Sequence, residues 1–246
     1  MKDIRRIVIT GVSSELGTVL AKGLARTEGV EIIGTMRRRR NASDKFPINV
    51  ALLDRCDLTD SKCCKRLADM VSDRFAGPFG FVHSVGDFWT HVPFGDVDSD
   101  HAKRVFSSHV LTLYSALQAL VPLMISRGGG SCVAFSCNSV QYNYPWMAAF
   151  TASKNAVDSL IRSLAHEFAG DGLRLNSLVL ASLKTKKVRA SKPHGDYAHF
   201  IAPQEIVPIV HFLMSSASML VNGNSIDVYR YSKDFYRRGY FERVSQ

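Results

Sequence analysis

The sequence contains no uninterrupted apolar run of about 18 residues, so we expect no transmembrane helix. The amino-terminal stretch MKDIRRIVITG also lacks an apolar segment followed by small residues, which a secretory signal would need. Cysteine and tryptophan are scarce, with five and two residues respectively. These absences favour a cytoplasmic protein without a membrane span.

The five cysteines are an odd number, and none belongs to a CxxC pair with a second ligand cluster nearby. A zinc site or another metal site is therefore not expected. Cys63 and Cys64 are neighbours on a predicted helix, so we expect that they cannot both face inward. A reduced protein with free thiols is the prediction.

Positive charge is in excess, with a net charge of +9 and a pI of about 9.4. It gathers in three runs, of which the first is Arg37–Arg40. The other two contain Lys184, Lys186, Lys187, Arg189 and Lys192, and then Arg230, Lys233, Arg237, Arg238 and Arg243. Such runs fit solvated loops, or acidic partners such as nucleotide phosphates, an acyl carrier protein or anionic lipid. No nucleic-acid-binding motif accompanies them, so nucleic acid is not expected.

Apolar runs and helical patterns alternate along the chain. Predicted strands cover residues 7–9, 31–35, 50–53, 80–83, 132–136, 174–179 and 225–228, and the longer predicted helices cover 101–125, 148–168 and 202–215. Further helices are expected up to about residue 27 and through residue 72. This order predicts an α/β fold, a single doubly wound parallel sheet with helices on both faces. Residues 1–246 form one domain in this interpretation, with a basic aromatic tail over about 229–246.

Chemistry-bearing residues concentrate between Cys137 and Lys154. A strand ends just before this stretch and a helix begins inside it. In an open α/β sheet, ligands bind where strand ends and helix starts converge. We therefore expect the functional site here.

A glycine-bearing turn joins the first strand to the first helix, with Gly11 and Gly17 in the segment TGVSSELG. Such a turn directs backbone N–H groups and a helix N-terminus at phosphate. With Asp57-Leu58 after the third strand and Gly86 after the fourth, the chain resembles the short-chain dehydrogenase/reductase (SDR) family. It is most similar to its β-ketoacyl-ACP reductase-like members, over Ile7 to Val228, which implies a Rossmann-type fold.

The resemblance implies a set of cofactor-binding positions. They are Thr10, Gly11, Ser13, Leu16, Gly17, Arg37, Arg38, Asp57, Leu58, Gly86, Lys154 and Thr185. Where an NAD-selective site has an acid, this chain has arginines, which favour the 2′-phosphate of NADP(H). The family's NNAG tetrad is His83-Ser84-Val85-Gly86 here.

One position opposes the cofactor. The family's turn reads TGxxxGxG, and Glu15 stands in place of the middle glycine. A glutamate adds bulk and negative charge where the pyrophosphate approaches. Alternatively, its carboxylate turns outward and caps the helix N-terminus. NADP(H) is therefore the cofactor to expect, with Glu15 as the reason for doubt.

The family's catalytic tetrad is degenerate. Its tyrosine, the proton donor, is matched by Phe150, its serine by Cys137 and its asparagine by His109. Only Lys154, which in the family lowers the tyrosine pKa and holds the nicotinamide ribose, is retained. Phenylalanine has no proton to give, so the resemblance implies a change of chemistry.

Several replacements are open. Tyr142 or Tyr144 would serve as an alternative acid, and Ser136 or Ser139 would serve in place of Cys137. His109 and Cys137 would form an acid–base or thiolate pair if they face each other; otherwise both pack in a vacated cavity. Lys154 either holds ribose or a substrate phosphate, or is a solvated remnant.

Three functions follow. The first is an SDR-fold protein without ordinary ketoreductase activity, acting as a binding or partner subunit. It would pair, with itself or a homologue, through the helices at about 101–125 and 148–168, as family members do, and engage an acyl carrier protein or another acidic partner. The second is an NADP(H)-dependent reductase with a rebuilt acid. The third is a non-redox reaction using His109 and Cys137. The tail is expected to dock on its own or a sister subunit.

Overall fold

The computed structural model describes residues 3–38, 46–87, 91–191, 193–194 and 196–230. Within these residues, seven parallel strands form one sheet in the order β3-β2-β1-β4-β5-β6-β7. The strands are β1 Arg6–Thr10, β2 Glu31–Thr35, β3 Val50–Leu53, β4 Phe79–His83, β5 Gly130–Cys137, β6 Leu173–Leu180 and β7 Ser225–Val228. The predicted doubly wound parallel sheet is confirmed.

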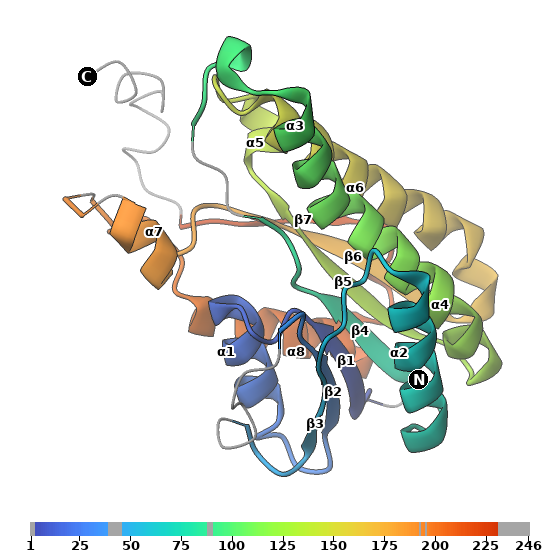
Figure 1. Ribbon diagram of the computed structural model, residues 1–246. Coiled ribbons are helices and arrows are strands. Elements are labelled where there is room, and N and C mark those ends of the chain that lie inside the picture. The colour runs from blue at the N-terminus through green and yellow to red at the C-terminus, as the bar shows by residue number, and fades with distance from the viewer. Residues whose placement is uncertain (1–2, 39–45, 88–90, 192, 195, 231–246) are drawn as a thin grey trace.

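Helices cover both faces of the sheet (Figure 1). On one face lie α1 Glu15–Leu24 and α8 Val207–Met214, and on the other lie α2 Ser61–Arg74, α4 Thr112–Ser126 and α6 Ala148–Glu167. Two short helices, α5 Ser139–Tyr142 and α7 Lys186–Ser191, stand at the carboxyl ends of the strands. Neither short helix was predicted, because four to six residues carry too little periodicity.

The strand pattern explains the two cores. In β1, Ile7 and Ile9 pack with α1 and α8, whereas Val8, between them, packs with α2, α4 and α6. Successive side chains of a strand point to opposite faces, so a strand that is apolar throughout must be covered twice. The continuous apolar runs in the sequence are therefore what demands helices on both faces.

Strand β1 pairs with both β2 and β4. The chain builds outward from β1 to β3, then returns to the other side of β1 to continue with β4. All strands are parallel, so their carboxyl ends share one edge. The strand order reverses beside β1, and open α/β sheets bind ligands at the carboxyl edge of such a reversal.

The helix predicted over 101–125 is interrupted. It consists of α3 Ser99–Phe106, a π-helical segment Ser107–Leu111, and α4. Inside it, the hydroxyl of Thr112 donates a 2.7 Å hydrogen bond to the carbonyl oxygen of Ser108. A π-helical turn accommodates one additional residue and leaves the apolar pattern on either side unchanged. The hydrophobic periodicity of the sequence therefore did not predict it. Such turns are frequent at functional sites.

The run Ser99–Ser126 is long and apolar enough, by length and composition alone, to cross a membrane. Of its most apolar window, 44% is buried inside the protein. Leu113, Leu117 and Leu120 on its inner face belong to the sheet core. The core helix of a globular domain meets the same criteria of length and composition, so this helix is weak evidence for a transmembrane segment.

The prediction of free thiols was wrong for two cysteines. Cys56 and Cys63 form a disulfide with Cα atoms 5.3 Å apart, and Cys64, Cys132 and Cys137 are free. The expectation that Cys63 and Cys64 cannot both face inward was also wrong, because each is less than 5% exposed. The first turn of α2 packs against the end of β3, so the side chains of both Cys63 and Cys64 are buried. No paired-cysteine motif in the sequence signalled this disulfide.

All three basic runs extend beyond the described residues. Arg37 and Arg38 are described and exposed, whereas Arg39 and Arg40 lie outside. Of the predicted tail over 229–246, only Tyr229 and Arg230 are described, so its docking stays a prediction. Lys192 also lies outside.

Candidate cofactor and active site

The glycine turn after β1 is tightly built. Gly11 has a φ of +76°, which disfavours other residues, and a Cβ on Gly17 would lie 2.3 Å from the carbonyl oxygen of Gly11. The hydroxyl of Ser14 accepts a 2.9 Å hydrogen bond from the N–H of Gly17 and caps α1. Thr10 is buried, Ser13 exposed and Leu16 half-buried. The turn therefore has the close backbone approach that a phosphate cradle needs.

Glu15 points away from its own helix. Its carboxylate accepts a 2.7 Å hydrogen bond from the backbone N–H of Lys186, the first residue of α7. The hydroxyl of Thr185 accepts a 3.3 Å hydrogen bond from Val188 in the same helix. Glu15 thus joins the glycine turn to the basic segment after β6. Neither predicted alternative describes this, since the carboxylate turns outward but caps a different helix.

The ends of β2 and β3 are joined by backbone hydrogen bonds. Met36 donates to Leu53 and accepts from Cys56, each at 3.0 Å. The carboxylate of Asp57 accepts hydrogen bonds from the backbone and hydroxyl of Thr59, at 3.0 and 2.7 Å. Those bonds, and the charge of Arg37, hold the Asp57 pKa below its usual value. The predicted ribose-phosphate and adenine positions thus lie beside one another, with Leu58 buried beneath them.

His83 links the glycine turn to the π-helical segment. Its Nδ1 lies 2.9 Å from the hydroxyl of Thr10, and its Nε2 lies 3.2 Å from the hydroxyl of Thr112. Thr112 donates onward to the carbonyl oxygen of Ser108. This pattern suits a neutral ring with its proton on Nε2. Burial and the charge of Lys154 lower the His83 pKa to about 3, so the ring stays neutral.

Gly86 leaves room for two site residues. A Cβ there would lie 2.8 Å from His109 Cδ2 and 3.7 Å from Lys154 Nζ. The end of β4, the π-helical segment and α6 therefore meet at this glycine. The structure brings together Gly86, His109 and Lys154 as the sequence predicted.

His109 is fixed by hydrogen bonds at both ring nitrogens. Nε2 lies 3.1 Å from the carbonyl oxygen of Asp87, and Nδ1 lies 2.8 Å from the hydroxyl of Ser153. A carbonyl only accepts, so Nε2 carries the proton. Burial, reinforced by Lys154, lowers the His109 pKa to about 3. A pairing of this ring with Cys137 would require one of these two bonds to break.

Phe150 is the residue that the resemblance matches to the family's proton donor. Its ring meets His109 edge to face, with centroids 5.3 Å apart, and its centroid lies 5.8 Å from Lys154 Nζ. Lys154 is buried, and its ammonium donates a 3.0 Å hydrogen bond to the carbonyl oxygen of Phe135. Burial lowers the lysine pKa to about 8, against opposing effects of Cys137 and Asp158. The alternative of a solvated lysine was wrong.

The serine alternatives point elsewhere. Ser136 donates a 2.9 Å hydrogen bond to the carboxylate of Asp158, inside the core. The hydroxyl of Ser139 is fully buried and has no hydrogen-bond partner. Cys137 is half-buried, with its thiol 3.5 Å from the amide oxygen of Asn138. Neither serine therefore replaces Cys137, and its thiol is the candidate polar group at the end of β5.

Tyr142 and Tyr144 stack on each other, with centroids 5.8 Å apart. The Tyr144 hydroxyl accepts a 3.0 Å hydrogen bond from the side-chain amide of Asn138. Both rings pack in one apolar cluster with Phe150 and Met147. They line the same region as the catalytic positions.

Sequence reasoning missed a polar group beside these rings. The side-chain amide of Gln141 donates a 2.6 Å hydrogen bond to Asp227, and the Tyr229 hydroxyl contacts both residues. It also missed buried Asp158, whose pKa is raised by burial. Asp158 follows Lys154 by four positions, so helical spacing was a usable signal.

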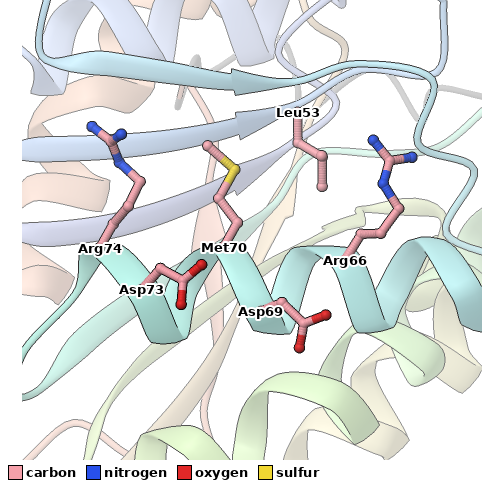
Figure 2. A pocket seen from close by; sticks show the side chains of 6 residues that line it. All are labelled: Leu53, Arg66, Asp69, Met70, Asp73 and Arg74. Carbon is pink, nitrogen blue, oxygen red and sulfur yellow. The ribbon is translucent and has the colours of Figure 1, made fainter.

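Within the described residues, no group of three or more metal-ligating side chains occurs. An open hollow of about 480 Å³ lies between α2 and the end of β3. Its lining is Leu53, Arg66, Asp69, Met70, Asp73 and Arg74. Figure 2 shows Met70 and Leu53 facing each other with the arginines on either side. The mixed charges give it no clear ligand preference.

Comparison with known proteins identifies the family. The model of the family described as Enoyl-(Acyl carrier protein) reductase matches residues 11–229. The chain belongs to the short-chain dehydrogenase/reductase family. The assignment of its tetrad positions to Phe150, Cys137, His109 and Lys154 stays a prediction from the resemblance.

Characterised SDR relatives are distant but span the chain. Gluconate 5-dehydrogenase of Gluconobacter oxydans is 26% identical and covers 91% of this chain and 92% of its own. D-xylose 1-dehydrogenase of Caulobacter vibrioides is 25% identical, covering 89% and 92%. These relatives place the chain among the SDR oxidoreductases.

Solved structures agree. A short-chain type dehydrogenase/reductase of Mycobacterium ulcerans is 25% identical, with a TM-score of 0.82 over 93% of this chain and 90% of its own. A short-chain dehydrogenase of Escherichia coli CFT073, complexed with NADPH, is 24% identical with a TM-score of 0.81, covering 92% and 97%. The second likeness concerns the fold alone.

Proposed function

We propose that this SDR protein binds NADP(H) and acts as a binding or partner subunit, without the tyrosine-dependent carbonyl reduction of ordinary SDR enzymes. The observation that carries the proposal is Phe150. Its benzyl ring occupies the donor's position against His109 and Lys154. A carbon-bound hydrogen has no acidity to offer a developing alkoxide.

Two protic groups beside Phe150 each donate a hydrogen bond to a backbone carbonyl oxygen. His109 is neutral and its Nε2 proton faces the Asp87 carbonyl oxygen. The ammonium of Lys154 donates to Phe135. A positioned general acid is worth about 10²- to 10⁴-fold in rate. Loss of the phenol with no replacement in place is therefore expected to abolish practical turnover.

The cofactor residues fit NADP(H) with one exception. Gly11 and Gly17 keep the close approach that a Cβ would block. Exposed Arg37 and Arg38 suit a 2′-phosphate, and Asp57 with Leu58 suits the adenine. The SDR neighbour of the same fold crystallised with NADPH is consistent with this choice. When bound, NADPH supplies a hydride.

The exception is Glu15, whose charge opposes a pyrophosphate. Its hydrogen bond to the N–H of Lys186 draws the carboxylate toward α7. We expect binding to persist, weakened by the charge. Thr185 and Lys154 would hold the nicotinamide end, the lysine through the ribose hydroxyls.

The partner surface we propose is the outer face of α3, the π-helical segment and α4, with α6 beside it. Leu111 and Tyr114 are each 52% exposed there, and Phe106 is 38% exposed. Burying such side chains favours self-association or pairing with a homologue. The basic α7, with Lys186, would engage an acidic partner such as an acyl carrier protein. The cytoplasm is the compartment we propose.

A second candidate is an active NADP(H)-dependent oxidoreductase. The buried Lys154 favours it, because an amine with a pKa of about 8 is acidic enough to pass a proton near neutral pH. In that case the relatives named gluconate 5-dehydrogenase and D-xylose 1-dehydrogenase suggest a polyhydroxylated substrate. Tyr144 is a further acid candidate, because its hydroxyl oxygen accepts a hydrogen bond from Asn138 that would also stabilise a phenolate.

One experiment separates the candidates. NADPH at about 100 times its Kd is expected to raise the Tm by roughly 5 °C. NADPH oxidation is then followed with 5-ketogluconate and with a β-ketoacyl thioester, and no consumption above background is expected. Absence of a Tm shift at millimolar NADPH would refute nucleotide binding. Steady NADPH consumption by the unmodified chain would favour the second candidate.

A further inference from the structure

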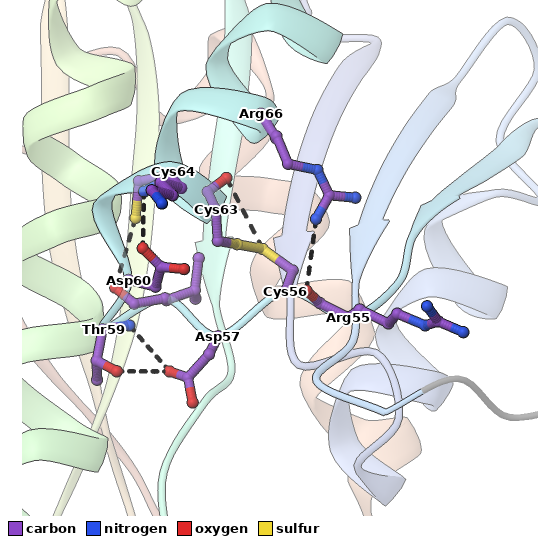
Figure 3. The surroundings of a disulfide bond; sticks show 10 residues. Arg55, Cys56, Asp57, Thr59, Asp60, Cys63, Cys64 and Arg66 are labelled. Carbon is purple, nitrogen blue, oxygen red and sulfur yellow. Dashed lines mark hydrogen bonds between the residues drawn. A yellow bond between two sulfur atoms is a disulfide. The ribbon is translucent and has the colours of Figure 1, made fainter.

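The disulfide lies within the proposed adenine site (Figure 3). Cys56 and Cys63 are seven positions apart and close a covalent loop around Asp57, Leu58 and Asp60. Cys56 follows the end of β3, and Cys63 sits in the first turn of α2. The loop is therefore the same piece of backbone that would hold the adenine ring.

Hydrogen bonds attach this loop to both neighbours. The N–H of Cys56 donates to the carbonyl oxygen of Met36 at 3.0 Å, just before Arg37. The carboxylate of Asp60 accepts from Lys62 at 2.9 Å and caps α2. A change in the covalent state of the loop would thus be felt at the adenine position and at the proposed 2′-phosphate position.

We propose that Cys56–Cys63 is a reversible redox modification site, at which reduction by a dithiol weakens NADP(H) binding. The inference rests on the proposed function, and it names the regulation of that nucleotide site. The closed loop holds Asp57 and Leu58 in one arrangement, whereas the open loop must be ordered when the nucleotide binds. The oxidised chain therefore binds more tightly.

The exchange is balanced in electrons and protons. A thiolate of the dithiol attacks one sulfur of the cystine, the bond between Cys56 and Cys63 breaks, and the released sulfur takes a proton. The second thiol of the reductant resolves the mixed disulfide. Two cysteine thiols form, and the reductant leaves as its own disulfide. Both sulfurs are buried, so attack follows opening of the first turn of α2, where Ser61 and Lys62 are exposed.

The third thiol nearby serves as a control. Cys64 lies next to Cys63, and its thiol faces the carbonyl oxygen of Leu58 at 3.4 Å. Burial, with the nearby charges of Asp60 and Asp57, raises the Cys64 pKa. Exchange requires a thiolate, so Cys64 stays out of it. A serine at position 64 keeps a donor for Leu58.

The test maps thiols and measures nucleotide affinity on the full chain. Without reductant, alkylation under denaturing conditions should label only Cys64, Cys132 and Cys137. After dithiothreitol treatment all five cysteines should be labelled, and the Kd for NADPH should rise about tenfold. Cys64→Ser should keep this response. The double variant Cys56→Ser/Cys63→Ser should lose it and bind like the reduced chain.

Each contrary result has a definite meaning. Five labelled thiols before reduction, an unchanged Kd after reduction, or a response that survives in the double variant would each overturn the redox site. If NADPH binds neither redox form, the proposed nucleotide binding itself fails, and its regulation with it. The comparison of the two forms of the native chain does not depend on how well the variants fold.

Discussion

The ammonium group of Lys154 donates a 3.0 Å hydrogen bond to the carbonyl oxygen of Phe135, deep at the end of β5. The lysine lies under Phe150, where a phenol would share its charge in an ordinary SDR enzyme. Here the charge faces a backbone carbonyl and a benzene ring, and Cys137 and Asp158 are the groups that favour its charged form. The effect of Phe150 on activity and the effect of the buried Lys154 on stability can therefore be measured.

The first prediction concerns the lost donor. Phe150→Tyr should restore an acidic hydroxyl beside Lys154, and Phe150→Tyr/Cys137→Ser should also restore a good hydrogen-bond donor for a carbonyl. We expect measurable NADPH-dependent ketone reduction in the double variant, about 10²-fold above the unmodified chain. Initial rates of NADPH consumption check it. Phe150→Leu is the matched control and should stay inactive.

The second prediction concerns Glu15. Glu15→Gln removes the charge while keeping the size of the side chain, so NADPH should bind about tenfold more tightly. Isothermal titration measures the change. Glu31→Gln, at the amino end of β2, removes an exposed charge at the opposite end of the sheet from the turn and should leave the Kd unaltered. An unchanged Kd for the Glu15 variant would show that its carboxylate lies out of reach of the phosphates.

The third prediction concerns pH. The Lys154 pKa falls from 10.5 to about 8 on folding because burial disfavours the ammonium. Between those values the unfolded chain holds more protons than the folded chain, so this lysine makes the free energy of unfolding rise with pH. Its destabilising effect is complete below about 8 and fades toward 10.5.

Lys154→Met should therefore raise the Tm at pH 7, and its advantage over the unmodified chain should shrink as the pH increases to 10. Thermal unfolding at unit pH steps measures this. Lys65→Met, on the exposed face of α2, should show no such trend. An advantage that stays constant with pH would mean that Lys154 titrates as an exposed lysine does.

The fourth prediction concerns Arg174, a buried arginine of β6. Its guanidinium donates to the carbonyl oxygens of Leu213, Ser218 and Val221, at 2.8 to 3.3 Å. Arg174→Ala leaves those buried acceptors unpaired and should lower the free energy of unfolding by about 2–4 kcal/mol. Urea denaturation measures it. Exposed Arg26→Ala should change stability by less than about 0.5 kcal/mol.

The fold was predictable because apolar runs and helical periods alternate regularly. The run around Val8 predicts a strand covered on both faces, and the glycines at 11 and 17 locate its first turn. The hydrophobic pattern does not predict hydrogen bonds between residues that are far apart in the sequence. Glu15 reaches an N–H 171 positions along the chain, and no local signal selects that acceptor over its own helix.

The candidate site was predictable by position and less so by environment. The resemblance to the family assigned Gly86, His109 and Lys154 to one site, and in the structure the three residues lie together. That Lys154 is buried follows from packing between β5 and α6, which spacing alone does not reveal. The cystine was missed for the same reason, since Cys56 and Cys63 meet only when α2 folds back under β3.

The π-helical segment has a consequence for how this chain tolerates change in length. A π turn amounts to an α-helix with one additional residue. Deleting one position between Ser107 and Leu111 would therefore return the backbone to regular α geometry and leave the inward faces of α3 and α4 aligned as before. Only the direction of the imidazole at 109 would be lost. Sister sequences one residue shorter at this point would thus share the scaffold while lacking the ring beside Gly86.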